Sequence, residues 1–159
     1  MSDGRWPVGE VEVQNLIDQG ELEEVEPSDE HADLLMRQAE THLASAPTLL
    51  PGDPPGAFTV LYDAARKSLA AVLAKQGLRA TNKNGHRATQ EAIEAQLGPN
   101  ARKVVRPFRT LRVRRHDAEY PGLDTPEVTV DEAEEALNDA RSIVEAMKKL
   151  SPNVGAWRN

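Results

Sequence analysis

The sequence predicts an all-α fold, a bundle of four to five helices preceded by a short acidic extension. Apolar residues recur every three or four positions in several segments, which is the period of a helix with one buried face. The alternating pattern of β-strands is almost absent, and clusters of glycine and proline separate the helical segments. A chain of 159 residues is long enough for one domain with a real core. We place the acidic extension at residues 1–27, the bundle at 28–150 and a flexible tail at 151–159.

The first half of the chain predicts one short helix and two core helices. The short helix covers residues 11–19 and stops at Gly20. Ser28 is a good N-terminal cap for a helix over 28–46. The proline-rich segment 46–57 is then an exposed loop, and a second core helix over 58–76 ends at Gly77. Residues 77–85 follow as a polar turn.

The second half predicts three further helical segments. A weaker helix covers 86–97, and a basic helical element covers 101–116, which Pro107 should kink or start. The sequence from Thr129 to Glu132 has the capping-box pattern, in which each end satisfies an amide of the other. A long final helix therefore begins there, and its apolar stripe continues to Leu150.

Composition indicates where the protein acts. The chain has no cysteine, so disulfides, thiolate metal sites and cysteine nucleophiles are excluded. The N-terminus lacks a secretory signal pattern, and no window approaches the roughly 18 apolar residues that span a bilayer. We therefore expect a cytoplasmic protein with no membrane partner.

Positive charge is concentrated in one segment of an acidic chain. The net charge is −7, yet residues 101–120 hold seven basic side chains against Asp117 and Glu119. Such a stripe can bind a polyanion locally while the rest of the surface suppresses indiscriminate binding. The alternative is that the acidic N-terminal arm or the last helix lies beside the stripe and neutralises it.

Several classes of site lack their sequence patterns. The four histidines are scattered, with no HExxH or paired acidic motif, so we expect no metal. His86, just after Gly85, is interpreted as a residue that caps or packs a turn. No P-loop, GxGxxG or GxSxG pattern is present, so we expect neither a nucleotide cofactor nor common serine-hydrolase chemistry.

The basic element itself has the residues for binding and cleaving RNA. Arginines recur every three or four positions and could share one helical face as a ladder for phosphates. His116 is the best proton carrier by its intrinsic pKa, and Tyr120 is the next candidate, as a hydrogen-bond donor or a structural phenol. In metal-independent RNA cleavage the 2′-hydroxyl attacks the adjacent phosphodiester. The protein needs only to orient the RNA backbone, stabilise the pentavalent anion and transfer two protons. The predicted RNA-binding residues are Arg102, Arg106, Arg112 and Arg114, and the predicted catalytic residues are Arg109, Arg115, His116 and Tyr120.

Four stretches together resemble a bacterial HEPN domain over roughly residues 28–150. They are "LYDAARKSLAAVLAKQGLRA" (61–80), "GHRATQEAIEAQLG" (85–98), "RVRRHDAEYP" (112–121) and "EAEEALNDARSIVEAM" (132–147). The resemblance implies a four- to five-helix bundle that forms a homodimer. It also implies metal-independent ribonuclease activity, as in the toxins of toxin–antitoxin and phage-defence modules.

The family motif is an arginine, a polar residue, a few further residues and a closing histidine. Arg115 and His116 match its opening, but Tyr120 stands where the closing histidine is expected. The alternative alignment pairs Arg109 with His116 and lacks the polar residue after the arginine. In some pairs of this family a partner nucleotidyltransferase acts as the antitoxin and modifies a tyrosine near the motif, and Tyr120 resembles such a target by position.

Two other functions stay open at this point. A non-catalytic HEPN protein would use the same basic groove to bind RNA or a nucleotide, or to regulate a partner. A helical assembly protein would instead pair its arginines with Glu119, the acidic arm or the last helix of a second subunit.

Overall fold

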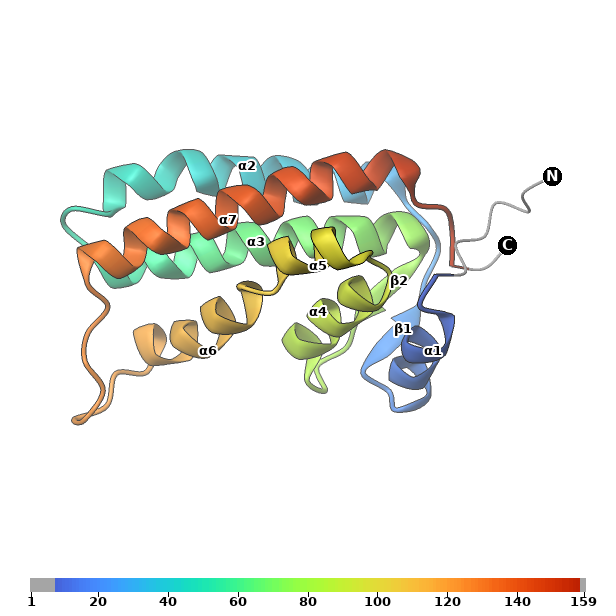
Figure 1. Ribbon diagram of the computed structural model, residues 1–159, viewed down its shortest axis with the longest axis horizontal. Helices are drawn as coiled ribbons and strands as arrows, with labels where there is room; N and C mark the ends of the chain where they lie inside the picture. The colour runs from blue at the N-terminus through green and yellow to red at the C-terminus, as the bar shows by residue number, and fades with distance from the viewer. Residues whose placement is uncertain (1–7, 158–159) are drawn as a thin grey trace.

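The computed structural model describes residues 8–157 and confirms the all-α class (Figure 1). Helices α2, α3 and α7 are the three long elements, and the one β-sheet in this range has two strands. In chain order the elements are α1 (Glu10–Asp18), β1 (Leu22–Glu24), α2 (Asp29–Leu49), α3 (Pro54–Gln76), β2 (Leu78–Ala80), α4 (Gly85–Ala95), α5 (Pro99–Val105), α6 (Phe108–Glu119), α7 (Val130–Leu150) and a 3-10 turn at Ser151–Asn153.

Helix α3 is the centre of the bundle. It packs against α2 and α7, which run alongside it, and also contacts α4 and α6 (Figure 1). Leu61, Leu69 and Val72 on this helix are at most 1% exposed. Because α3 is covered by several helices, none of its residues is exposed, and its polar side chains lie close to neighbouring helices.

Helix α7 confirms the prediction made from its capping box and apolar stripe. The Thr129 hydroxyl accepts from the amide of Glu132, and the Glu132 carboxylate accepts from the amide of Thr129. Ala140, Ile143 and Met147 are fully buried, while Leu137 is only partly buried against the core.

The two short strands were not predicted. Strand β1 pairs antiparallel with β2, with Glu23 opposite Arg79. Their side chains also form an ion pair, with an N–O distance of 2.6 Å. Segment 78–80, predicted as part of a polar turn, therefore belongs to a sheet that joins the N-terminal segment to the end of α3.

Gly77 ends α3, as predicted, and its backbone explains why a glycine is needed. Its φ is +82°, and a Cβ at this position would lie 2.7 Å from the carbonyl oxygen of Val25. The close approach lets Val25 donate its amide to the Gly77 carbonyl at 2.8 Å. The segment before α2 therefore passes directly over the end of α3 and is hydrogen-bonded to it.

Both ends of the described chain are packed more tightly than predicted. Val13 and Leu16 of α1 are buried in the main core, so this part of the acidic segment belongs to the bundle. Within the predicted flexible tail, Trp157 is 1% exposed, and its backbone amide donates to the Gln76 carbonyl at 2.7 Å. The expectation of a frayed tail is therefore wrong for residues 151–157, because a large apolar side chain anchors it.

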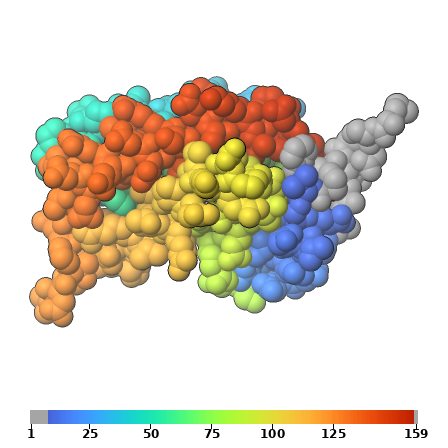
Figure 2. Space-filling view, in the orientation of Figure 1, coloured from blue at the N-terminus to red at the C-terminus, as the bar shows by residue number. Residues whose placement is uncertain are grey.

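Two prolines affect where the helices end and begin, Pro47 against the prediction and Pro107 in agreement with it. Pro47 lies within the last turn of α2, so this helix extends into the predicted loop and ends at Leu49. Pro107 separates the basic element into α5 and α6. The connection from α6 to α7 projects from one end of the molecule (Figure 2), and Leu123 on it is fully exposed. Among the described residues, no helix combines the length and apolar character needed to cross a membrane.

Candidate functional site

The arginines of the basic element do not form one ladder. The break at Pro107 puts Arg102 on α5, where its guanidinium donates to the backbone carbonyls of Glu94 and Leu97 at 3.2 and 3.1 Å. These two carbonyls lie at and just beyond the end of α4, so Arg102 caps that helix. Arg106, in the break itself, is exposed. Of these two predicted RNA-binding residues, Arg102 is thus used in joining α4 to α5.

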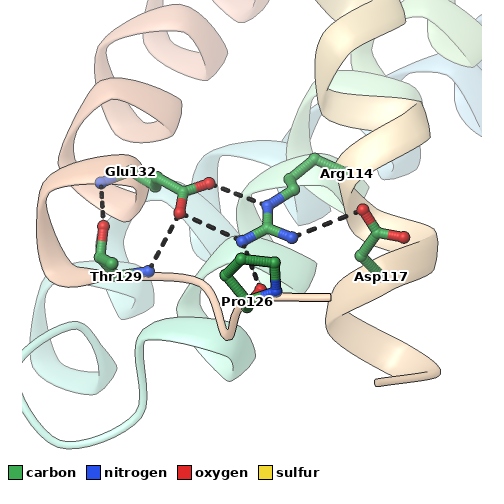
Figure 3. Close-up of polar contacts among 5 residues, drawn as sticks. All are labelled: Arg114, Asp117, Pro126, Thr129 and Glu132. Atoms are coloured by element: carbon green, nitrogen blue, oxygen red, sulfur yellow. Dashed lines mark hydrogen bonds and ion pairs between the residues drawn. The ribbon is translucent and has the colours of Figure 1, made fainter. Parts of the chain in front are cut away.

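Arg114 is occupied by structural contacts as well (Figure 3). Its guanidinium donates to both carboxylate oxygens of Glu132, at 2.8 and 3.1 Å, and to the Pro126 carbonyl at 2.8 Å. Asp117 adds a longer ion pair at 3.4 Å. The hydrogen bond from Arg114 is the largest cause that lowers the pKa of Glu132 below its ordinary value. Arg114 therefore fastens α6 to the start of α7.

His116 and Tyr120 lie together near the end of α6. Their ring centroids are 5.1 Å apart, and both residues are exposed, Tyr120 at 67%. Arg109 is also exposed on this helix. These three predicted catalytic residues therefore lie on the surface and are not enclosed by other side chains.

Arg115 points into the molecule instead. Its Cζ atom lies 5.2 Å from the centroid of the Tyr62 ring, a cation–π contact with α3. Tyr62 itself is fully buried and stacks on Phe108 of α6 at 5.2 Å. The Arg115 guanidinium also forms an ion pair with Glu119 at 2.9 Å. Phe108 and Arg115 of α6 therefore both contact this tyrosine of α3.

Tyr62 connects α6 to a histidine that the sequence did not single out as functional. Its hydroxyl lies 2.7 Å from Nδ1 of His86, at the start of α4. The buried carboxylate of Glu21 holds this end of α4 in place, because it accepts from Asn84 at 3.2 Å and from Arg87 at 3.1 Å. Glu21 of the acidic N-terminal segment thus neutralises Arg87 and holds the turn that carries His86.

The electrostatics around this pair bring in two more arginines. Burial lowers the pKa of His86, and Arg66, Arg115 and Arg112 lower it further, in that order among the cations. Burial also raises the pKa of Tyr62 to about 12, although the same arginines oppose the rise. Near neutral pH the phenol is thus protonated and the imidazole uncharged. We call Tyr62, Arg66, His86, Arg112 and Arg115 the arginine–histidine cluster.

The arginines of this cluster have spare hydrogen-bond donors. The Nε atoms of Arg66, Arg112 and Arg115 are buried, and none makes a hydrogen bond in the described part of the chain. Asp63 lies 3.6 Å from Arg66 and Glu119 pairs with Arg115, so two carboxylates face three guanidinium groups. The excess of positive charge and donors suits an anionic ligand, and a phosphate matches the planar fork of a guanidinium group.

Sequence reasoning therefore found two members of the cluster, Arg112 and Arg115, and missed three. Tyr62 and Arg66 are one turn apart on α3 and read as flanks of its apolar stripe. His86 was interpreted as a turn residue, and the fold brings it to Tyr62 from 24 positions away. One signal was available in the sequence. Tyr62 and Arg66 carry hydrogen-bonding groups within a helix whose other residues are mostly apolar.

Metal ligation has no support in the described segment 8–157, where no group of three or more histidine, aspartate or glutamate side chains is placed to hold a metal ion.

Comparison with known proteins places the chain in a family. The HEPN domain profile matches residues 32–150, which is most of the chain and runs from the first turn of α2 to the end of α7. Neither the comparison with curated proteins nor that with solved structures found a match. The matched range contains every member of the arginine–histidine cluster. On the extent of this match, the chain belongs to the HEPN domain family.

Proposed function

We propose that this protein is a ribonuclease that binds RNA phosphates at the arginine–histidine cluster and cleaves RNA without a metal. The observation that carries the proposal is the set of three buried arginine Nε atoms that make no hydrogen bond, beside a histidine whose pKa is lowered; the Nε of Arg66 forms only a long ion pair with Asp63, at 3.6 Å. An uncharged imidazole among guanidinium groups can accept a proton near neutral pH while the cations stabilise negative charge on phosphorus.

The proposed reaction is attack by the ribose 2′-hydroxyl on the adjacent phosphodiester. The bond from the 2′-oxygen to phosphorus forms, and the bond from phosphorus to the 5′-oxygen breaks. In the tautomer with its proton on Nδ1, His86 donates to the Tyr62 hydroxyl and leaves Nε2 free to accept the 2′-hydroxyl proton. The protonated imidazole, or water, returns a proton to the 5′-oxygen. The products are a 2′,3′-cyclic phosphate and a 5′-hydroxyl.

In this proposal Arg112 and Arg115 bind the phosphate. Both are on α6, and both act electrostatically on Tyr62 and His86. Their guanidinium groups would hold the phosphate oxygens and stabilise the charge that develops in the transition state. Glu119 pairs with Arg115 and would have to share it with the phosphate.

The biological setting extends the same proposal. A metal-independent ribonuclease of this family would act in the cytoplasm as the toxin of a toxin–antitoxin or phage-defence pair, and as a homodimer. The exposure of Tyr120, at 67%, makes it accessible to a partner nucleotidyltransferase that acts as an antitoxin. Modification there would add negative charge next to His116, whose ring it contacts.

A second function is favoured by the position of His116 and Tyr120. The histidine of the sequence motif contacts Tyr120 on the exposed side of α6, and a phenol cannot serve as a base near neutral pH. If His86 does not act as the base, the same cluster would bind RNA without cleaving it.

Cleavage and binding are tested together with purified protein in EDTA. Wild type is compared with Arg112→Ala, Arg115→Ala and His86→Asn, since asparagine can keep a hydrogen bond to Tyr62 but cannot act as a base. The exposed residues provide controls, Arg109→Ala for charge and His116→Ala for an imidazole outside the cluster. We expect RNA fragments ending in cyclic phosphate from wild type and both controls, and none from the cluster variants.

The other outcomes are equally informative. Intact RNA that wild type retains at low salt, and releases steeply as salt rises, would replace the nuclease with the RNA-binding function. Cleavage that His86→Asn keeps and His116→Ala loses would refute the assignment of the base to the cluster.

A further inference from the structure

A groove of about 720 Å³ opens beside the arginine–histidine cluster. It lies between the start of α2, the middle of α3, strand β2 and the start of α4. Arg66 and His86 line this groove and also belong to the cluster. A ligand held by these two side chains can therefore extend directly into the groove.

The groove has an apolar floor and a polar rim. Leu73 and Leu78 on the floor are each 1% exposed, and Leu35 and Ala70 lie beside them with partial exposure. The more exposed lining residues that donate or accept hydrogen bonds include Ser28, His31, Arg79, Thr81 and Asn82. The groove combines apolar and polar side chains, and its volume falls within the range of about 300–1,000 Å³ that is typical of pockets for small organic ligands.

The charges lining the groove favour a ligand with an anionic end. Arg66 and Arg79 are its cations, and Glu26 is its one carboxylate. Glu23 pairs with Arg79 at 2.6 Å and so occupies that guanidinium. Arg66 makes no hydrogen bond through its buried Nε atom and only a longer ion pair with Asp63, at 3.6 Å, so it is the more available of the two cations. The anionic end of the ligand is therefore expected at Arg66 and His86, with the remainder over the leucine floor.

We propose that this groove binds one unstacked nucleoside of the RNA, next to the phosphate at the arginine–histidine cluster. This inference rests on the proposed function, because it supplies the subsite for the nucleotide beside the bond to be cleaved. Single-stranded RNA is recognised through bases that are splayed out, packed on apolar surfaces and hydrogen-bonded along their edges. The groove offers a floor for the base face and a rim for its edge.

Asn82 is the rim residue best suited to read a base edge. It is exposed on the turn after β2, and its side-chain amide makes no hydrogen bond to the described residues. A carboxamide has both a donor and an acceptor, as the pairing edge of a base does. Thr81, in contrast, already donates its hydroxyl to the Gly20 carbonyl at 2.6 Å. The groove therefore distinguishes among bases chiefly through Asn82.

The test is titration calorimetry with nucleoside 3′- and 5′-monophosphates, which contain no bond that the enzyme could cleave. Inorganic phosphate and the uncharged nucleosides are titrated in parallel. Ala70→Leu fills the groove from a position outside the core clusters, and Ala44→Leu adds the same side chain at an exposed position of α2 that does not line it.

We expect wild type and Ala44→Leu to bind one series of monophosphates at least about tenfold more tightly than inorganic phosphate. Ala70→Leu should lose this advantage while it keeps the thermal melting point of Ala44→Leu. Asn82→Ala should reduce the differences among the four bases. Equal affinity for phosphate and nucleotides, or nucleotide binding that Ala70→Leu does not weaken, would overturn the inference.

These outcomes separate the subsite from the proposed catalysis. Nucleotide binding in the groove without any RNA cleavage would refute the nuclease and leave the subsite. Cleavage by a protein whose groove binds no nucleotide would refute the subsite and leave the nuclease.

Discussion

Arg114 and Arg115 are neighbours in the sequence, and the structure predicts opposite effects for their removal. Arg114 fastens α6 to α7 through Glu132 and Pro126, whereas Arg115 faces Tyr62 in the arginine–histidine cluster. We predict that Arg114→Ala lowers stability and leaves RNA binding nearly intact. Arg115→Ala should have its main effect on RNA binding and cleavage.

The expected loss for Arg114→Ala follows from its contacts. The variant removes two hydrogen bonds to Glu132 and one to a backbone carbonyl, around a guanidinium that is 18% exposed. Buried charge-assisted bonds contribute about 1.5–3 kcal/mol each, but Glu132 is 37% exposed, so solvent screens the pair and we expect about 1.5–3 kcal/mol in total. For a chain of this size that corresponds to a fall in melting temperature of roughly 3–10 °C.

The assay is thermal and urea unfolding of a double-mutant cycle with Arg114→Ala and Glu132→Gln. The cycle isolates the pair, since effects of contacting residues are not additive. Arg109→Ala is the matched control, because it removes an exposed arginine from the same helix. A melting temperature for Arg114→Ala equal to that of the control, or purely additive effects in the cycle, would refute the structural role of Arg114.

The same pair predicts a pH dependence. Arg114 lowers the pKa of Glu132 below its ordinary value of 4.5, so the folded state holds the carboxylate more strongly than the unfolded state does. The stabilisation is complete above the unfolded pKa and is lost as the pH falls through the lower, folded pKa. Glu132→Gln should therefore remove part of the acid sensitivity of wild type.

Three further predictions concern the cluster and the core. Tyr62→Phe should cost about 0.5–1.5 kcal/mol, because it deletes a buried hydroxyl bonded to His86, and it should move the His86 titration seen by NMR; an unmoved titration would contradict the contact. The lowered pKa of His86 means that neutral imidazole is favoured in the fold, so stability should fall as the pH drops below about 6.5, and His86→Asn should flatten this dependence in urea unfolding. Ile143→Ala should cost about 2–5 kcal/mol by leaving a cavity, and Leu137→Ala less, because Leu137 is only partly buried; equal losses would contradict the packing of α7.

The parts of the fold that the sequence predicted depend on local signals. The capping box at Thr129 and the stripe ending near Leu150 lie within one helix, so their physics can be read from neighbouring residues. The two strands could not be predicted in this way, because each has three residues and Glu23 pairs with a residue 56 positions away. Three residues are too few to display the alternation that marks a strand.

In the site, too, features set by neighbouring residues could be predicted and contacts between distant residues could not. A ladder of arginines requires one straight helix, and Pro107 ends that geometry between Arg106 and Arg109. Within α6 the partner chosen by each side chain depends on which residues of α3 and α7 lie opposite. Neither Tyr62 nor Glu132 belongs to α6, so the partners that separate Arg114 from Arg115 come from other helices.

Within the described residues, the acidic N-terminal segment contacts the site through Glu21, which holds the start of α4. The sequence predicted residues 1–27 to be an acidic extension and left open whether this arm or the last helix neutralises the basic stripe. Its buried Glu21 instead accepts from Asn84 and Arg87, on the two sides of His86 in the chain, while Leu22 packs in the core. Because the Tyr62–His86 contact joins α3 to α4, the orientation of the imidazole depends on how firmly the start of α4 is held. The carboxylate at Glu21 supplies that restraint from outside the helix, so an acidic residue supports the site that we propose for an anion.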